Sequence, residues 1–242
     1  GEHARSVREA LKLRRHIHLE PRVQGLQPAA ASRRFPSYLA PAMTQLPELP
    51  LTLSRQEIRK MIRQRRRALT PEQQQEMGQQ AATRMMTYPP VVMAHTVAVF
   101  LSFDGELDTP PLIEHLWRAG KRVYLPVLHP FSAGNLLFLN YHPQSELVMN
   151  KLKIHEPKLD VRDVLPLSRL DVLITPLVAF DECGQRLGMG GGFYDRTLQN
   201  WQHYKMQPVG YAHDCQLVEK LPVEEWDIPL PAVVTPSKVW EW

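Results

Sequence analysis

Short apolar segments alternate with helical segments along most of this chain, and that alternation is the feature that most limits its fold. The segment DVLITP (171–176) is an almost continuous apolar run, as expected of a strand buried on both faces of a sheet. Strands that alternate with helices favour an α/β fold with a mainly parallel sheet. We therefore expect a three-layer α/β sandwich of the Rossmann-like type, preceded by an N-terminal helical segment.

Capping residues mark where the predicted helices begin. Ser54 and Glu57 have the spacing of a capping box. Thr70 and Pro71 mark a second helix, with the proline at the first helical position, and Thr109 is the expected cap of a third. The predicted helices cover 54–69, 70–88 (ended by Pro89 and Pro90), 109–120 and 193–201, and the predicted strands cover 96–102, 122–127, 135–141, 171–176, 208–212 and 232–236.

The excess basic charge is confined to the first 42 residues. The 242-residue chain has a formal net charge of +4. Residues 1–42 hold eight Lys/Arg and three acidic residues, so the remainder holds 21 basic and 22 acidic residues and a net charge of −1. That balance argues against a broad surface for nucleic acid on the body of the protein.

Residues 1–42 also lack any sustained helical or strand period. Three interpretations stay open: a basic targeting peptide, which three glutamates fit poorly, a disordered tail that contacts nucleic acid or acidic partners, or a start-site assignment in which Met43 is the initiator. We expect the third. The chain is accordingly divided into a basic extension at 1–42, disordered or not native, and a single α/β domain at 43–242.

Cysteine usage and hydropathy limit the class of protein further. The two cysteines, Cys183 and Cys215, lack a zinc-type spacing and do not indicate a disulfide framework. No apolar run approaches the about 18 residues that a membrane helix needs. We expect a cytoplasmic monomer that binds neither a membrane nor a specific nucleic acid, and whose scattered histidines lie on the surface or serve the structure.

The segment RLGMGGGFYDRTL (186–198) places four glycines within five positions before a predicted helix. Glycines let the backbone approach an anion, and a helix N-terminus offers unpaired N–H groups. No Lys-Ser/Thr follows as in a P-loop, and Phe193 stands where a G-x-G-x-x-G motif needs its third glycine. The glycines alone therefore fit either a phosphate site or a tight turn with positive φ.

The neighbours of the glycines favour a phosphate site. Arg186 and Arg196 can neutralise phosphate charge. Asp195 can hold Mg²⁺, which is usually bound by one or two carboxylates together with phosphate oxygens. Phe193 and Tyr194 can stack on a planar ligand. The alternatives are that Asp195 only favours the first turn of the helix and that Arg196 is a solvated charge.

The segment GQRLGMGGGFYDRTL resembles the signature of the 5-formyltetrahydrofolate cyclo-ligases, also called methenyltetrahydrofolate synthetases. Further blocks are similar to the family in the same order: SRQEIRKMIRQRRRAL, FLSFDGELDTPPLIEHLWRAGKRVYLPV, DVLITPLVAFDECGQRLG and LPVEEWDIPLPAVVTP. The resemblance covers about residues 54–236. The chain departs from it at Met189 and Gly191, where some members carry a basic residue, and at Phe193, where a tyrosine is common.

The resemblance implies an ATP- and Mg²⁺-dependent enzyme that converts 5-formyltetrahydrofolate to 5,10-methenyltetrahydrofolate and releases ADP and phosphate. Phosphorylation of the formyl oxygen lets N10 attack, close the ring and expel phosphate. Phosphoryl transfer needs mainly alignment and charge neutralisation. Reduced folate and ATP are thus the expected small-molecule partners, and Mg²⁺ is the expected metal.

The resemblance also implies roles for individual residues. Arg186 and Tyr194 are the implied catalytic residues. Glu106, Phe193 and Tyr194 would bind the folate, because a carboxylate suits the N–H donors of a pterin edge. The implied ATP-binding residues are Arg55, Arg59, Arg186, Gly188, Met189, Gly190, Gly191, Gly192, Phe193, Tyr194 and Arg196.

By the same resemblance, Asp195 and Asp227 would hold Mg²⁺, with Glu224 and Glu225 close to the second of them in sequence. Glu106 could instead be a loop acid before a helix cap. Arg55 and Arg59 are four residues apart and share a helix face. A solvated basic face is the alternative for the other arginines of this helix, which are Arg63, Arg65, Arg66 and Arg67.

Two other functions stay open at this point. One is a sugar-phosphate or acyl-CoA-type enzyme on a similar α/β scaffold, against which the basic helix and the paired acids argue. The other is a nucleic-acid binder that uses the N-terminal extension and the RQRRR run, against which the net charge of the body argues.

Overall fold

One eight-stranded sheet organises residues 53–242, the part of the chain that this computed structural model describes. Across the sheet, the strands are β13 (Val239–Glu241), β12 (Ala232–Val234), β10 (Gln207–Tyr211), β7 (Val172–Thr175), β1 (Thr96–Ala98), β2 (Arg122–Leu128), β3 (Leu136–Tyr141) and β6 (Val164–Leu165). The run from β12 to β2 is parallel, and the outer strands pair antiparallel. The predicted extension at 1–42 and the start of the predicted 43–242 domain lie outside the described residues.

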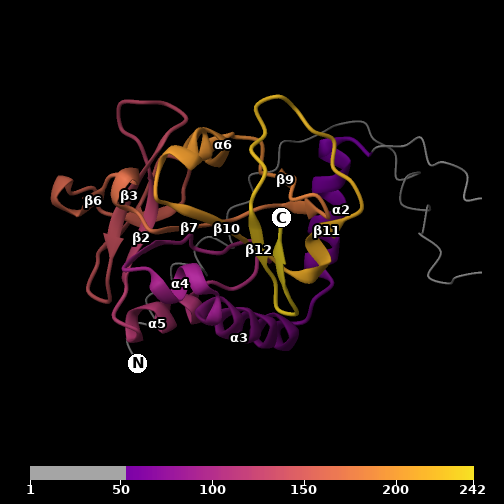
Figure 1. Ribbon diagram of the computed structural model, residues 1–242, viewed down its shortest axis with the longest axis horizontal. Helices are drawn as coiled ribbons and strands as arrows, with labels where there is room; N and C mark the ends of the chain where they lie inside the picture. The colour runs from indigo at the N-terminus through magenta and orange to yellow at the C-terminus, as the bar shows by residue number, and fades with distance from the viewer. Residues whose placement is uncertain (1–52) are drawn as a thin grey trace, which may run out of the picture.

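Helices cover both faces of this sheet, which confirms the predicted α/β class. The helices α3 (Pro71–Thr87), α4 (Pro89–Met93) and α5 (Pro110–Arg118) lie on one side of it, and α6 (Phe193–Leu198) lies on the other (Figure 1). Each side has its own apolar core. Met85 and Leu112 are buried in the core on the α3 and α5 side, and Phe180 and Leu198 are buried in the core on the α6 side.

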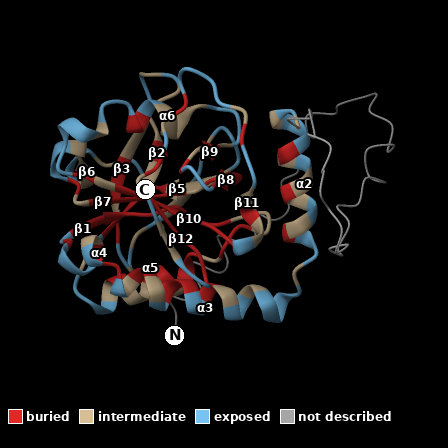
Figure 2. Ribbon diagram, turned by 45° about the vertical axis from the view of Figure 1, so that its right-hand side comes forward, coloured by how far each residue is buried: buried red, intermediate tan, exposed pale blue. Residues whose placement is uncertain are grey.

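A small second sheet extends the fold at the end where α2 (Arg55–Arg67) stands. It contains β11 (Leu217–Val218), β8 (Ala179–Asp181) and β9 (Arg186–Leu187), in that order. Ile58 and Ile62 of α2 are buried against Val178 and Leu187 of this region. Arg66 is buried as well, and the other residues of the helix are more exposed (Figure 2). A separate ribbon pairs β4 (Leu147–Met149) with β5 (His155–Pro157). Short 3₁₀ helices connect other elements, among them η4 (Trp201–His203) and η5 (Asp214–Gln216).

The three predicted caps all stand at the N-cap positions of their helices, and two of them make the side-chain capping bond. The Ser54 hydroxyl accepts from Glu57 N at 3.1 Å. Thr70 forms a capping box with Gln73, and Pro71 is the first residue of that helix. Thr109 stands at the N-cap position of α5, as predicted, but its side chain makes no capping hydrogen bond. Its Oγ1 accepts instead from the backbone N–H of Ser102 at 3.0 Å, because both residues are buried and satisfy each other within the loop that joins β1 to α5.

Several elements differ in extent from the predictions, and three differences are informative. The strand expected over 96–102 ends at Ala98, although the residues that follow remain mostly buried. The helix expected over 193–201 ends at Leu198, because Asn200 adopts a positive φ of 58°. Pro89 not only follows the end of α3 but also begins α4, since proline suits the first position of a helix.

Candidate active site

Three arginines of α2 contact three segments that are far apart in the sequence. The pairs are Arg55 with Asp227, Arg59 with Gly188, and Arg63 with Asp104. The arginines are spaced by four residues, so they lie on one face of the helix. With a rise of about 1.5 Å per residue, the first and last are separated by about 12 Å along the axis. The face of α2 that carries these arginines, the α2 arginine face, therefore borders the whole site.

At one end of this face, Arg55 forms a two-pronged ion pair with the predicted metal ligand Asp227. Arg55 Nη1 and Nη2 donate to Asp227 Oδ2 and Oδ1 at 2.7 and 3.2 Å. Asp227 Oδ2 also accepts from Glu224 N at 2.8 Å. The hydrogen bond to Asp227 is the main reason that the pKa of Arg55 is raised. The pair ties the C-terminal segment to α2.

Arg186 and Asp195 form a second ion pair. Arg186 Nη2 lies 2.5 Å from Asp195 Oδ1, and the arginine side chain is almost completely buried. Burial lowers the pKa of Arg186, and the charge of Asp195 opposes that shift. Asp195 Oδ1 also accepts from Ile228 N at 3.2 Å. Because Ile228 directly follows Asp227, the two predicted metal ligands are brought to neighbouring positions.

The glycine loop connects β9 to α6 and lies against α2. Arg59 Nε donates to Gly188 O at 3.0 Å. A Cβ built on Gly190 would lie 3.6 Å from Arg59 Nη2, so the guanidinium faces the loop. Burial is the main reason that the pKa of Arg59 is lowered. Gly190 and Gly192 have positive φ of 109° and 68°, so the loop is also the tight turn that the glycines allow.

Arg196 braces the other side of the glycine loop. Its Nη2 donates to Gly191 O and its Nε donates to Gly134 O at 2.6 Å, in the connection between β2 and β3. Its Cζ also lies 5.5 Å from the centre of the Phe193 ring. The side chain is exposed to solvent, but both of these nitrogens donate hydrogen bonds to backbone carbonyls. The alternative that Arg196 is only a solvated charge is therefore incomplete.

The remaining predicted residues of this region flank the loop. Phe193 and Tyr194 begin α6, and Tyr194 packs partly against the core on that side of the sheet. Met189 is exposed at 55% of its surface, at the middle of the loop. The loop thus presents backbone and one apolar side chain outwards, with Arg59 and Arg196 on either side.

Glu106 lies in the segment that follows β1. It is buried, and its Oε1 accepts from Phe103 N at 2.9 Å. Because β1, β7 and β10 are parallel, the segments after them meet at one edge of the sheet. The contact of Asp104 with Arg63 places this segment at the other end of the α2 arginine face.

Sequence reasoning missed some residues of this site and misjudged others. The Asp-Gly pair at 104–105 is a recognised turn signal that could have indicated Asp104. The alternative that the arginines of α2 form a solvated face is wrong for Arg66, which is 4% exposed. Arg65 also has a partner, since its Nη1 donates to Cys215 O at 3.1 Å. Helix α2 is therefore docked by its arginines as well as by its isoleucines.

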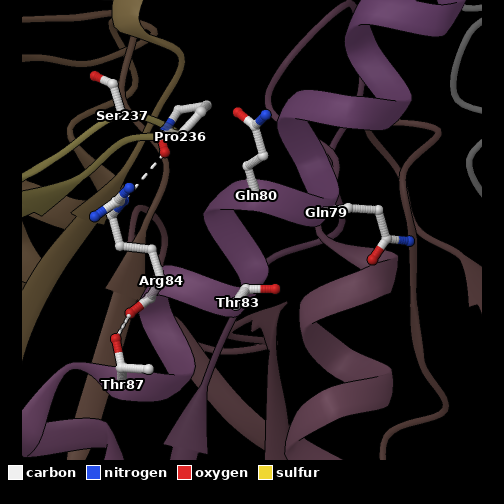
Figure 3. Close-up of a pocket in the computed structure, with 7 residues that line it drawn as sticks. All are labelled: Gln79, Gln80, Thr83, Arg84, Thr87, Pro236 and Ser237. Atoms are coloured by element: carbon white, nitrogen blue, oxygen red, sulfur yellow. Dashed lines mark hydrogen bonds between the residues drawn. The ribbon is translucent and has the colours of Figure 1, made fainter.

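A groove of about 680 Å³ lies elsewhere, between α3 and the turn after β12 (Figure 3). It is lined by Gln79, Gln80, Thr83, Arg84, Thr87, Pro236 and Ser237. Arg84 Nε donates to Pro236 O at 3.0 Å, which joins its two walls. None of the predicted site residues lines this groove, so it is separate from the candidate active site.

Residues 53–242 lack two features. They contain no group of three or more His, Cys, Asp or Glu side chains placed to hold a metal ion. They also contain no helix with the length and apolar character needed to cross a bilayer. A metal at Asp195 and Asp227 would therefore need additional ligands from water or from a bound phosphate.

Comparisons with known proteins identify the family of the chain. Residues 52–236 match the model of the 5-formyltetrahydrofolate cyclo-ligase family. The 5-formyltetrahydrofolate cyclo-ligase of Escherichia coli strain K12 is 97% identical over 182 residues, which cover 75% of this chain and 100% of the relative. The Haemophilus influenzae enzyme of the same name is 53% identical over 179 residues, which cover 74% of this chain and 96% of the Haemophilus enzyme.

A solved structure gives the same result for the fold. The structure of Aquifex aeolicus 5,10-methenyltetrahydrofolate synthetase superimposes with a TM-score of 0.67 at 28% sequence identity. The match covers 78% of this chain and 93% of the Aquifex chain.

Proposed function

This chain is an enzyme of the 5-formyltetrahydrofolate cyclo-ligase family, and from that premise we propose that it converts 5-formyltetrahydrofolate to 5,10-methenyltetrahydrofolate with ATP and Mg²⁺. ADP and phosphate are the other products. The observation that carries the proposal is the convergence of α2, the glycine loop and the C-terminal segment, through Arg59 on Gly188, Arg186 on Asp195 and Arg55 on Asp227.

The ATP phosphates would bind between the glycine loop and α2. Arg59 faces the loop from the helix, and Arg196 reaches it from the opposite side. Arg55, Arg186 and residues 188–194 complete the proposed nucleotide site. Glycine N–H groups and guanidinium groups are the donors that phosphate oxygens require. Arg59 also supplies charge beside Gly190, close to where some family members carry a basic residue within the loop.

Asp195 and Asp227 fit a magnesium site in their donor chemistry. Asp195 directly follows the glycine loop, and both contacts described for it use the same oxygen, Oδ1. Asp227 lies in the C-terminal segment, where both of its oxygens accept from Arg55. Each acid is paired with an arginine, which holds the carboxylate in place. Mg²⁺ bound there with phosphate oxygens would neutralise negative charge on the phosphoryl group during transfer.

The folate would bind with its pterin at Glu106 and its formyl group near the ATP γ-phosphate. The formyl oxygen takes the γ-phosphoryl group from ATP, and ADP leaves. N10 then attacks the formyl carbon, and the C–O bond to phosphate breaks as the ring closes. Arg186 and Tyr194 would stabilise the charge that moves onto the phosphate oxygens, and Phe193 would contact the folate.

The reaction is tested by mixing the protein with 5-formyltetrahydrofolate and MgATP and following the near-ultraviolet band of the methenyl product. The band should grow only when both ATP and Mg²⁺ are present. Asp195→Asn should reduce the rate strongly, whereas Glu182→Gln, an exposed acid in the β8–β9 hairpin, should not. A folded protein that produces no band would contradict the proposed reaction and would favour a sugar-phosphate or acyl-CoA substrate instead.

A further inference from the structure

A tight turn at residues 103–106 carries Glu106. Asp104 and Gly105 have positive φ of 47° and 74°, and Glu106 N donates to Phe103 O at 2.9 Å. Positive φ at both central positions is typical of a type I′ turn, which Asp-Gly favours. Phe103 N in turn donates to the Glu106 carboxylate at 2.9 Å. The position of the turn therefore determines the position of the carboxylate.

Two side chains from distant segments hold the turn by one carbonyl oxygen. Gln74 of α3 and His213, which lies beyond the end of β10, each donate to Gly105 O at 3.1 Å. His213 is 1% exposed. Burial lowers the pKa of His213 to about 4, so the ring is neutral at pH 7. A carbonyl oxygen only accepts hydrogen bonds, which requires the proton to be on Nε2.

The hydrogen bonds of His213 continue towards the glycine loop. Its backbone N–H donates to Gln216 Oε1 at 2.8 Å. Gln216 Nε2 donates to the carbonyls of Leu177 and Val178 at 2.8 and 3.1 Å. Val178 N donates to Leu187 O at 2.7 Å, in the strand that enters the loop. His213 thus stands between the turn that carries Glu106 and the strand that enters the glycine loop.

We propose that His213 is a positioning residue that holds Glu106 at a fixed place relative to the glycine loop. This inference rests on the proposed function, in which Glu106 binds the pterin of the folate. The nucleotide half of the site is held independently by Arg55 and Arg59 from α2. Loss of the His213 hydrogen bond therefore acts on folate binding and leaves nucleotide binding nearly unchanged.

The test compares His213→Phe with His213→Gln, each followed by steady-state kinetics on the full chain. Phenylalanine keeps the ring but removes the donor, whereas the glutamine amide places an N–H near the position of Nε2. We expect His213→Phe to raise KM for 5-formyltetrahydrofolate by about tenfold, the effect of losing one buried hydrogen bond. KM for MgATP should stay within about twofold by the same reasoning. His213→Gln should recover most of the folate KM.

His203→Phe is the matched control, because that histidine is exposed in η4. Gln74→Ala removes the other donor to Gly105 O and should raise the folate KM in the same direction, so it tests the inference if His213→Phe does not fold. A folded His213→Phe with the wild-type folate KM would overturn the inference. So would an equal rise in both KM values, which a general loss of structure would produce.

Glu106→Gln separates this inference from the proposed function. If Glu106→Gln raises the folate KM and His213→Phe does not, the folate site stands and the positioning role of His213 is wrong. If Glu106→Gln has the wild-type folate KM, the assignment of Glu106 fails first, and the inference about His213 fails with it.

Discussion

Arg59 is the residue through which α2 reaches the glycine loop. Its guanidinium is half-buried, donates to Gly188 O and lies against Gly190. Arg59→Gln keeps an N–H donor but removes the charge beside the proposed phosphate site. We expect KM for MgATP to rise by about tenfold or more, as for the loss of a hydrogen bond to a charged group. Lys60→Ala, an exposed neighbour on the same helix, should leave that KM unchanged.

An unchanged KM for MgATP in Arg59→Gln would mean that the phosphates bind away from the loop face that Arg59 covers. The folate KM, measured in the same assay, should stay close to the wild-type value in both variants, because Glu106 lies towards the other end of the α2 arginine face.

Gly105 and Gly120 form a matched pair for testing the turn under Glu106. Both have a positive φ, 74° and 75°. A Cβ on Gly120 meets nothing within 4 Å, whereas a Cβ on Gly105 lies 3.3 Å from Arg66 Cβ. Gly120→Ala should cost about 1 kcal/mol of stability, from φ alone. Gly105→Ala should cost more and should also raise the folate KM.

Urea unfolding measures the stability of both variants, and the kinetic assay measures the folate KM. Equal losses of stability in the two variants, with the wild-type folate KM in each, would show that the turn tolerates displacement and that its contact with Arg66 is unimportant.

Single residues of the site differ in how far the sequence could predict them. Arg59 and Asp195 belong to patterns with a chemical meaning, a helix face and a glycine-rich loop. The contact of the His213 ring with Gly105 O follows from no local pattern, since it forms only where the segment after β10 meets the segment after β1. Such a residue is recognised from tertiary contacts alone.

At the scale of elements, two threonines that precede helices have different roles. Thr70 caps α3 through Gln73 N, whereas Thr109 bonds Ser102 inside a buried loop. Thr70→Val should cost about 1 kcal/mol, the usual effect of a lost cap. Thr109→Val should cost up to about 3 kcal/mol, because it leaves the buried N–H of Ser102 without its acceptor.

The measurement is again urea unfolding, with the slope checked for a two-state transition. If the two variants lose the same free energy, Thr109 would be acting as an ordinary helix cap, as the sequence alone predicts. Thr70 serves as the internal standard because its cap geometry is complete in the structure.

The longer helices and the central strands were predictable because their capping residues and apolar runs lie within one segment of the chain. The strands β8, β9 and β11 are only two or three residues long. Their pairing depends on where α2 and the central sheet bring them, which local propensity does not specify. The same reason explains why the contacts of Arg65 and Arg66 were not predicted.

At the scale of the whole molecule, His213 should make stability depend on pH. Its folded pKa of about 4 lies below the ordinary value of 6.5, mainly because of burial, with Arg66 and Asp214 as the charged groups that act on it. Between these values the unfolded chain binds a proton that the folded protein does not. Stability is therefore lost as pH falls, by about 2 kcal/mol between pH 7 and pH 5.

The free energy of unfolding of the full chain, measured in urea at pH 7 and at pH 5, checks this prediction. His213→Gln should remove most of the difference between the two values. An equally steep dependence in wild type and variant would assign the effect to other titrating groups, and His213 would then have to be more accessible to protons than its burial indicates.

The spacing of the three arginines on α2 has a consequence for how the chain can vary in length. A helix turns by about 100° per residue, so one inserted residue between Arg59 and Arg63 would rotate the later contact away from its partner. Helix α2 would therefore set the distance between the proposed nucleotide and pterin ends of the site, and its geometry disfavours such an insertion. The connection between β4 and β5, at residues 150–154, carries none of the predicted site residues, and insertions or deletions are expected to collect there.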